Sequence, residues 1–174
     1  MKALLIGDIH GLTVWKDIVS KHTDVDKVVF LGDYFDSFDI PGIDQLHNFK
    51  HIIEFKDNSN IDVTLLLGNH DHHYYGSNKR YAGYNGAMSH QFYDALSQNS
   101  NKVQVCEIID DLLITHAGVS PFWMDSNFDT WSIDTIKEDL NDLFRYRPRS
   151  FNSIYDPIDI EGKGGSIYAS PFWI

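Results

Sequence analysis

Four short clusters of polar residues in the sequence combine the side chains that bind divalent metal ions. They read GDIHG (7–11), GDYFD (32–36), GNHD (68–71) and THAG (115–118). Carboxylate, amide and imidazole groups mixed in this way suit manganese, iron or zinc better than calcium or an all-thiolate site. One Asp can bridge two ions through its two oxygens, and two metals roughly 3.5–4 Å apart can clamp the oxygens of a phosphoryl transfer. Each cluster alone is also typical of an ordinary turn, but their succession along the chain indicates one joint site.

The second cluster raises a question of charge. Asp33 and Asp36 follow KVVFL (27–31), an apolar run that predicts a buried strand. An uncompensated charge beside a buried strand is costly. A bound metal ion is therefore expected to neutralise these two carboxylates.

An alternation of strands and helices surrounds the clusters. Strands are predicted at 2–6, 27–31, 62–67, 102–109 and 112–116, with a hairpin turn at 110–111 between the last two. Helices are predicted at 13–22, 42–55, 88–98 and 132–144, the last of them capped by Ser132. Residues 74–86 are expected to form a long loop, and the tail from 146 on is expected to be irregular. This order predicts an α/β fold with a mostly parallel sheet, followed by a β-rich second half.

Each polar cluster directly follows one of these predicted strands. In open α/β sheets, ligands bind outside the carboxyl ends of the strands. The four loops should therefore deliver their polar side chains to one edge of the sheet. The glycines that allow sharp turns beside them are Gly7, Gly32, Gly68 and Gly118.

Composition narrows the class of protein. The length of 174 residues suits a single domain, expected to span 1–174. The net charge of −11 argues against a general DNA-binding protein, so nucleic acid is not the expected partner. The charge does not exclude a phosphorylated protein or small molecule as substrate, since a bound metal ion can reverse the sign of the local field. The single cysteine, Cys106, excludes an intramolecular disulfide and indicates a reducing, cytoplasmic location. The apolar run near the N-terminus is too short for a signal peptide or a membrane span, so no membrane partner is expected.

The four clusters, in this order, resemble the motifs of the calcineurin-like metallophosphoesterases, especially the phosphoprotein-phosphatase branch and its bacterial and phage relatives. The first three match the family in order and spacing, and the resemblance covers about residues 1–120. It implies a layered β-sandwich flanked by helices, in the order α-β-β-α. It also implies hydrolysis of a phosphoester, expected to be a phosphomonoester, by a water that bridges two divalent metal ions.

The resemblance assigns metal ligands residue by residue. Asp8 and His10 would hold the first metal, and Asp33 would bridge the two ions. Asn69 and His116 would hold the second metal.

The resemblance also implies a catalytic dyad. His70 would be the general acid that protonates the leaving oxygen, and Asp36 would orient and charge it. Such a pair is chemically reasonable, because a carboxylate beside an imidazole favours the protonated ring.

Two departures from the family pattern stand out. The second family motif continues with an Arg that grips the phosphate, where this sequence has Ser37. The family also supplies a last metal-binding His downstream, whereas no His follows His116 here. We therefore expect a C-terminally shortened member with a weaker second metal site and weak activity. The arginines that could replace the missing one, or simply be solvated surface charges, are Arg80, Arg145, Arg147 and Arg149.

Several aromatic residues and histidines near the third cluster have open roles. His72 and His73 are expected to be exposed loop histidines, with a role as substitute or supporting ligands left open. The tyrosines of the predicted loop either form a substrate-facing lid or pack the loop onto the domain. The terminal PFWI (171–174) indicates an edge strand or an apolar patch meant for burial.

Three functions fit these features. The leading hypothesis is a metal-dependent phosphoesterase. The second is a catalytically degenerate member of the same family that acts as a binding module, which the missing Arg and His favour. The third is a phosphodiesterase acting on nucleotides or nucleic acid, which the acidic charge disfavours.

Overall fold

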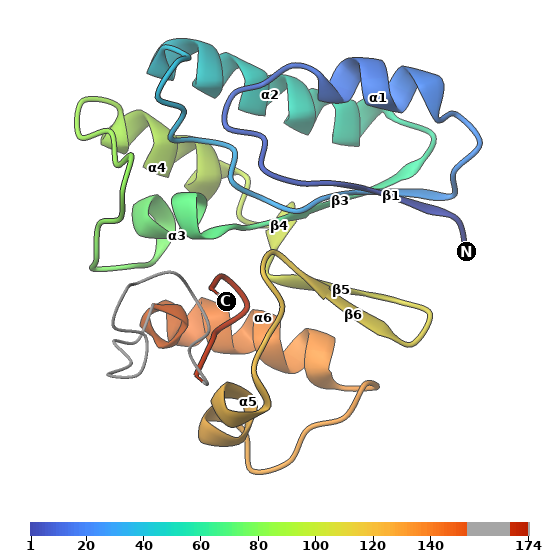
Figure 1. The fold of residues 1–174 in the computed structure, drawn as a ribbon, viewed down its shortest axis with the longest axis vertical. Coiled ribbons are helices and arrows are strands. Elements are labelled where there is room, and N and C mark those ends of the chain that lie inside the picture. The colour runs from blue at the N-terminus through green and yellow to red at the C-terminus, as the bar shows by residue number, and fades with distance from the viewer. Residues whose placement is uncertain (153–167, 174) are drawn as a thin grey trace. The chain divides into compact units, whose positions relative to one another are not determined.

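The computed structural model describes residues 1–152 and 168–173 of the chain (Figure 1). The chain divides into two compact units, Met1–Gln104 and Val105–Ile174. The first unit contains the first three polar clusters, and the second unit contains THAG (115–118). The single domain expected from the sequence stays a prediction.

A parallel four-stranded sheet forms the centre of the first unit. Its strands lie in the order β1 (Ala3–Ile6), β2 (Lys27–Phe30), β3 (Asp62–Leu66) and β4 (Val103–Gln104). Ile6 pairs with Phe30, and Phe30 pairs with Leu65, so the C-terminal ends of the three longer strands lie close to one level, with β3 one residue longer. Every residue of β2 is buried, as expected for a central strand covered on both faces. The strands predicted at 2–6, 27–31 and 62–67 are confirmed.

Helices flank this sheet. They are α1 (Trp15–Lys21), α2 (Gly42–Asn58), α3 (Asn69–Tyr75) and α4 (Ser89–Gln98), with α1 and α2 along one face of the sheet in Figure 1. The ring of Trp15 lies 5.5 Å from those of Phe30 in β2 and Phe55 in α2. Its indole N–H donates to Oδ1 of Asn48 at 3.0 Å, which satisfies the polar end of a buried ring. The predicted α/β class, with a parallel sheet flanked by helices, is confirmed.

The third polar cluster opens a helix and not an extended loop. α3 begins at Asn69, directly after Gly68, and continues to Tyr75. The expectation of exposed loop histidines is wrong, because His72 and His73 lie in this helix and are both buried. The loop predicted at 74–86 begins and ends later than expected, since the segment between α3 and α4 covers 76–88.

A β-hairpin begins the second unit. β5 (Cys106–Ile109) and β6 (Leu112–Thr115) pair antiparallel around the turn at 110–111, as predicted. The single strand predicted at 102–109 is wrong, because it is divided between β4 of the parallel sheet and β5 of the hairpin. Val105 makes the break, since its N–H donates at 2.8 Å to the side-chain oxygen of Asn141 and not to another strand.

The second unit continues with α5 (Pro121–Asn127), α6 (Ile136–Tyr146) and the 3-10 helix η1 (Pro148–Phe151). α5 was not predicted, although Ser120 accepts from the N–H groups of Phe122 and Trp123 and Pro121 stands at the first turn. The predicted cap at Ser132 is wrong, because α6 begins at Ile136. None of the helices in 1–152 and 168–173 is long and apolar enough to cross a membrane.

Aromatic side chains form the core of the second unit. The ring of Phe151 lies 5.1 Å from that of Trp123, 5.3 Å from that of Phe144 and 5.2 Å from that of Phe172. Phe172 belongs to the terminal PFWI run and is buried. Burial, one of the two alternatives for this run, is confirmed for Pro171 and Phe172, whereas Trp173 is half-buried.

Candidate active site

The loops after β1 and β2 bring Asp8, His10 and Asp33 together. One ligand atom of each lies within 4.8 Å of those of the other two. The backbones of the two loops are joined, because the His10 N–H donates to the carbonyl of Asp33 at 2.6 Å. All three residues have left-handed backbone, with φ of 50°, 39° and 57°. Such backbone is uncommon outside glycine and persists where the surroundings hold it, typically at functional sites.

The side chain of His10 is oriented as metal-binding histidines usually are. Its Nδ1 lies 2.6 Å from the carbonyl oxygen of Phe35, to which it donates, so that Nε2 is the nitrogen left to bind an ion. This Nε2 lies 3.7 Å from Oδ2 of Asp33, too far for a hydrogen bond. An ion between two ligand atoms accounts for such a separation, so these residues fit a divalent metal.

Asp71 of α3 fastens the loop after β2 to the loop after β3. Its Oδ2 accepts the N–H groups of Asp33 at 2.7 Å and Gly68 at 2.9 Å, and its Oδ1 accepts that of Tyr34 at 2.8 Å. Complete burial, and then the charge of Asp33, raise the pKa of Asp71 well above its usual value, against the effect of the three donors. A cation beside Asp33 would offset this repulsion between carboxylates, which is a second sign that the site suits a metal.

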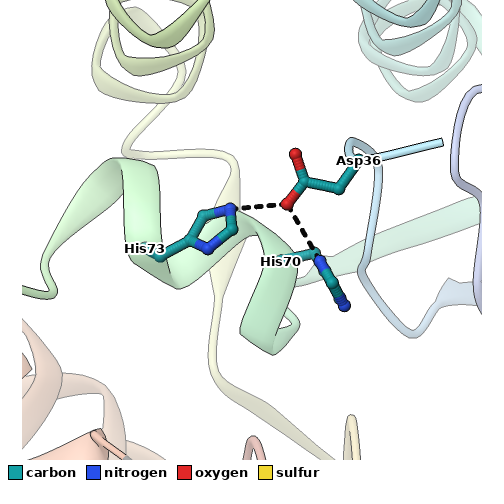
Figure 2. Close-up of side chains that lie close together, drawn as sticks. All are labelled: Asp36, His70 and His73. Carbon is teal, nitrogen blue, oxygen red and sulfur yellow. Dashed lines mark hydrogen bonds and ion pairs between the residues drawn. The ribbon is translucent and has the colours of Figure 1, made fainter. Parts of the chain in front are cut away.

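His70 and Asp36 form the predicted dyad (Figure 2). Nδ1 of His70 lies 2.9 Å from Oδ2 of Asp36. Burial lowers the pKa of His70, but the hydrogen bond to Asp36 and the neighbouring carboxylates outweigh it and raise the pKa overall. Burial raises the pKa of Asp36, but the hydrogen bonds from His70 and Tyr74 and the close approach of His73 outweigh it and lower the pKa overall. An ionised Asp36 therefore faces a readily protonated His70.

The dyad lies beside the metal-binding group. The ring of His70 is 5.1 Å from that of His10, edge to face, and the backbone N–H of His70 donates to Oδ1 of Asp33 at 2.9 Å. Because Nδ1 of His70 is turned to Asp36, its Nε2 is the atom that can give a proton to a substrate.

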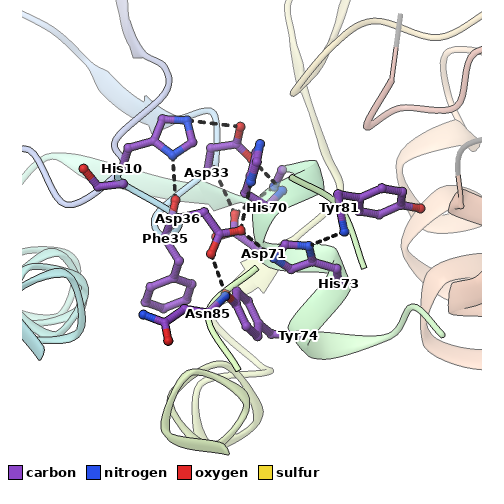
Figure 3. Close-up of polar contacts among 12 residues, drawn as sticks. His10, Asp33, Phe35, Asp36, His70, Asp71, His73, Tyr74, Tyr81 and Asn85 are labelled. Atoms are coloured by element: carbon purple, nitrogen blue, oxygen red, sulfur yellow. Dashed lines mark hydrogen bonds and ion pairs between the residues drawn. The ribbon is translucent and has the colours of Figure 1, made fainter. Parts of the chain in front are cut away.

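Asp36 has two further partners that the sequence interpretation missed (Figure 3). Nε2 of His73 lies 2.6 Å from Oδ2 of Asp36, a short contact whose angle is poor for a linear hydrogen bond. The hydroxyl of Tyr74 donates to Oδ1 of Asp36. Burial, and then the bond to Asp36, raise the pKa of Tyr74, so this hydroxyl keeps its proton. The signal for both residues was their helical spacing from His70, which is visible only once α3 is recognised.

The group of Asp36, His70 and His73 does not fit a metal, although three ligand atoms lie within 4.8 Å of one another. Their separations from Oδ2 of Asp36, 2.9 and 2.6 Å, are hydrogen-bond lengths. Ligands of a tetrahedral zinc lie about 3.3 Å apart when each is about 2.0 Å from the ion. The N–H of Tyr81 donates to Nδ1 of His73 at 3.2 Å, so the ring proton belongs on Nε2, where a metal would have to bind.

The remaining predicted metal ligands lie in different units. Asn69 is the first residue of α3, next to His70. His116 follows β6 in the second unit, in a loop held there by a bond from the Ala117 N–H to the carbonyl of Pro171 at 3.0 Å. Binding of a second metal by these two residues stays a prediction.

The candidate substrate arginines differ in their surroundings. The guanidinium of Arg80 lies 4.6 Å from the centre of the Tyr84 ring. Arg145 forms an exposed ion pair with Asp142 at 2.6 Å, and Arg147 follows the last residue of α6. Their contact with a substrate stays a prediction.

Ser37, where the family pattern has an arginine, shapes a turn. Its hydroxyl oxygen accepts the N–H groups of Asp39 at 3.2 Å and Ile40 at 3.1 Å. The buried side chain of Gln45 in α2 donates to the carbonyl of Ile40 at 2.6 Å. Ser37 thus fixes the chain directly after Asp36, a structural role that an arginine side chain would not supply.

A parallel α/β sheet whose strand-end loops gather carboxylates and histidines beside an Asp–His pair is typical of metal-dependent hydrolases. The chain belongs to the calcineurin-like phosphoesterase family, whose model matches residues 1–161. The match extends through the first unit and far into the second. No individual curated protein matches the chain. The resemblance read from the four clusters is confirmed at the level of the family.

Proposed function

We propose that this member of the phosphoesterase family hydrolyses phosphomonoesters of proteins or small molecules with the help of two divalent ions, manganese, iron or zinc. The observation that carries the proposal is the closeness of two groups. Asp8, His10 and Asp33 offer ligand atoms within 4.8 Å of one another. The hydrogen-bonded pair of His70 and Asp36 lies directly beside them.

The metal-binding roles follow from the donor atoms. Asp8, His10 and Asp33 would hold one ion, and Asp33 would share a second, weaker one with Asn69 and His116. When bound, the ions supply a nucleophile at neutral pH and positive charge that stabilises the transferring phosphoryl group.

His70 and Asp36 would supply the proton that the leaving oxygen needs. Asp36 holds Nδ1 of His70, so that Nε2 of the protonated ring can donate to the leaving oxygen of the substrate. Of the candidate arginines, Arg80 is the one we place at the substrate. It lies over Tyr84, whose ring stacks at 5.0 Å on that of Tyr74, and Tyr74 is bonded to Asp36.

Hydrolysis of p-nitrophenyl phosphate and of its bis ester, with and without Mn²⁺, tests the proposal. We expect Mn²⁺-dependent cleavage of the monoester in preference to the bis ester. Asp33→Asn removes a charge and a ligand oxygen, so it should lower both the metal content and the rate, the latter by more than about 100-fold. Asp39→Asn, at an exposed position outside the site, is the matched control and should change neither.

Three results would contradict the proposal in different ways. Preference for the bis ester would make the protein a phosphodiesterase. Metal binding without hydrolysis of either ester would make it a binding module. Full rate and full metal content in Asp33→Asn would remove Asp33 from the site.

A further inference from the structure

The segment between α3 and α4, residues 76–88, is connected to the carboxylate of Asp36 in three ways. This segment, called here the tyrosine loop, contains Tyr81 and Tyr84. It follows the residues of α3 that contact Asp36, and, apart from Arg80 at the substrate, neither the family match nor the proposed chemistry gives it a role.

The first connection passes through His73. The backbone N–H of Tyr81 donates to Nδ1 of His73 at 3.2 Å, which fixes the ring proton on Nε2. That nitrogen lies 2.6 Å from Oδ2 of Asp36. The loop thus determines which nitrogen of a buried histidine presents its hydrogen to the carboxylate (Figure 3).

The second connection passes through Tyr74. The backbone N–H of Asn85 donates to the Tyr74 hydroxyl oxygen at 2.7 Å. The hydroxyl hydrogen is then directed to Oδ1 of Asp36. Oδ1 of Asp36 is therefore held by a hydroxyl that the backbone of the tyrosine loop orients, and Oδ2 lies against Nε2 of a ring that the same loop orients.

The third connection is direct packing. Gly83 has φ of 82°, and a Cβ added there would lie 3.0 Å from Cβ of Asp36 and 3.3 Å from its carbonyl oxygen. Ring contacts hold the loop on both sides of Gly83. The ring of Tyr81 stacks on that of His73 at 5.8 Å, and the ring of Tyr84 stacks on that of Tyr74 at 5.0 Å. The loop is seated on the same two side chains through which its N–H groups act.

Asp36 needs such support. It is buried, and its φ of 69° is an uncommon backbone conformation for a residue other than glycine. Its carboxylate must stay in one rotamer if Nε2 of His70 is to point at the leaving oxygen, and small errors of position are costly in catalysis.

We propose that the tyrosine loop is the positioning element of the catalytic dyad, holding the Asp36 carboxylate through His73, Tyr74 and Gly83 and thereby aiming His70. The catalytic consequence of this positioning role rests on the proposed function. His73 and Tyr74 are positioning residues, because they act on the substrate only through Asp36 and His70.

The kinetic test removes one hydroxyl. Tyr74→Phe keeps the stacked ring and deletes the donor to Asp36, and Tyr93→Phe, on an exposed ring of α4, is the matched control. For Tyr74→Phe we expect kcat to fall about 10- to 100-fold, as for loss of a hydrogen bond to a charged group, with KM and Mn²⁺ content unchanged. The loss should be larger for phenyl phosphate than for p-nitrophenyl phosphate, because the poorer leaving group needs the proton more. The control should match wild type.

A second pair of variants tests His73. His73→Phe removes both ring nitrogens, whereas His73→Gln keeps an N–H donor at the reach of Nε2. We expect His73→Gln to recover part of the leaving-group-dependent rate that His73→Phe loses. Equal loss in the two variants, an equal loss for both leaving groups, or a fall in metal content would overturn the positioning role.

A spectroscopic test on the metal-free chain separates this inference from the proposed function. Long-range ¹H–¹⁵N spectra of the imidazole rings should show His73 with its proton on Nε2. In Gly83→Ala the His73 ring should populate both tautomers, because the added methyl group pushes the loop away from Asp36. A His73 ring protonated on Nδ1, or an unchanged spectrum in Gly83→Ala, would overturn the inference even if hydrolysis occurs. If no ester is cleaved but the spectra are as expected, the proposed function fails and the structural coupling stands.

Discussion

At the scale of the residue, Gly68 sets the space in which the proposed bridging ligand can lie. Its φ of −108° is open to any residue, so glycine is not required there by the turn itself. A Cβ at this position would lie 2.1 Å from Oδ1 of Asp33 and 2.7 Å from its backbone nitrogen. The glycine is therefore required by the closeness of Asp33.

We predict that Gly68→Ala displaces Asp33 and impairs the metal site. The rate of p-nitrophenyl phosphate hydrolysis should fall by about 10²-fold, the usual effect of misplacing a reacting group by about 1 Å, and Mn²⁺ content should fall with it. Gly7→Ala is the matched control from the first cluster, since its Cβ would meet only Leu31 at 3.6 Å, an ordinary contact. Circular dichroism checks that both variants fold, and equal activity in the two would contradict the steric argument.

The metal-binding residues of the first unit could be found from the sequence because their chemistry restricts the residue type. Asp8, His10 and Asp33 are recognisable as ligands without knowledge of any distance, and the structure brings them together. His73 and Tyr74 could not be found in the same way. Their role depends on the side of α3 from which they project, and the N-cap residue of that helix, Gly68, has no side chain that would mark its start.

At the scale of the element, Asp71 links α3 to the end of β2. Its carboxylate accepts three backbone N–H groups, from Asp33, Tyr34 and Gly68, at 2.7–2.9 Å. An asparagine has one carbonyl oxygen, so its amide nitrogen would face one of these N–H groups with no acceptor for it. A buried donor left unsatisfied costs about 1–3 kcal/mol.

We predict that Asp71→Asn lowers the free energy of unfolding by about this amount, 1–3 kcal/mol. Urea denaturation of the metal-free protein measures it, so that a change in metal binding does not enter. Asp39→Asn makes the same chemical change at an exposed position and should leave the midpoint unchanged. A midpoint for Asp71→Asn equal to that of Asp39→Asn would show that the three N–H groups find other acceptors.

Whether a segment is a helix or a strand could be predicted where its residue pattern was long. The residues at which helices and strands begin and end could not be predicted. The buried strands of the first unit follow from continuous apolar runs. The segment 102–109 also reads as one strand, but it changes sheets at Val105, because the side-chain amide oxygen of Asn141 in α6 accepts the N–H of that residue. Such a long-range bond leaves no local mark in the sequence.

At the scale of the whole molecule, the proposed ligand set draws on both units. Asp8, His10 and Asp33 belong to Met1–Gln104, whereas His116 belongs to Val105–Ile174. If His116 binds the same metal centre, as the resemblance implies, metal binding must stabilise the second unit as well as the first. The reactivity of the Cys106 thiol can report on opening of the second unit, because this single cysteine is buried.

The thiol of Cys106 should react only when the second unit opens. Burial raises its pKa to about 12, so almost no thiolate exists at pH 8 in the folded unit. A ligand that binds only the folded form reduces the open population in proportion to its excess over Kd. We therefore predict that Mn²⁺ at 100 times its Kd for the site that includes His116 slows the reaction of Cys106 with a thiol reagent by about 100-fold.

The decisive comparison is with His116→Ala, in which the metal should still bind to Asp8, His10 and Asp33 but should no longer protect Cys106. His90→Ala changes an exposed histidine of α4 in the first unit and should keep the full Mn²⁺ effect. Reaction rates with and without Mn²⁺, followed for the three proteins at one pH, give the answer. If Mn²⁺ protects Cys106 equally in wild type and His116→Ala, His116 is not a ligand. The link between the metal centre and the second unit would then have to come from other residues.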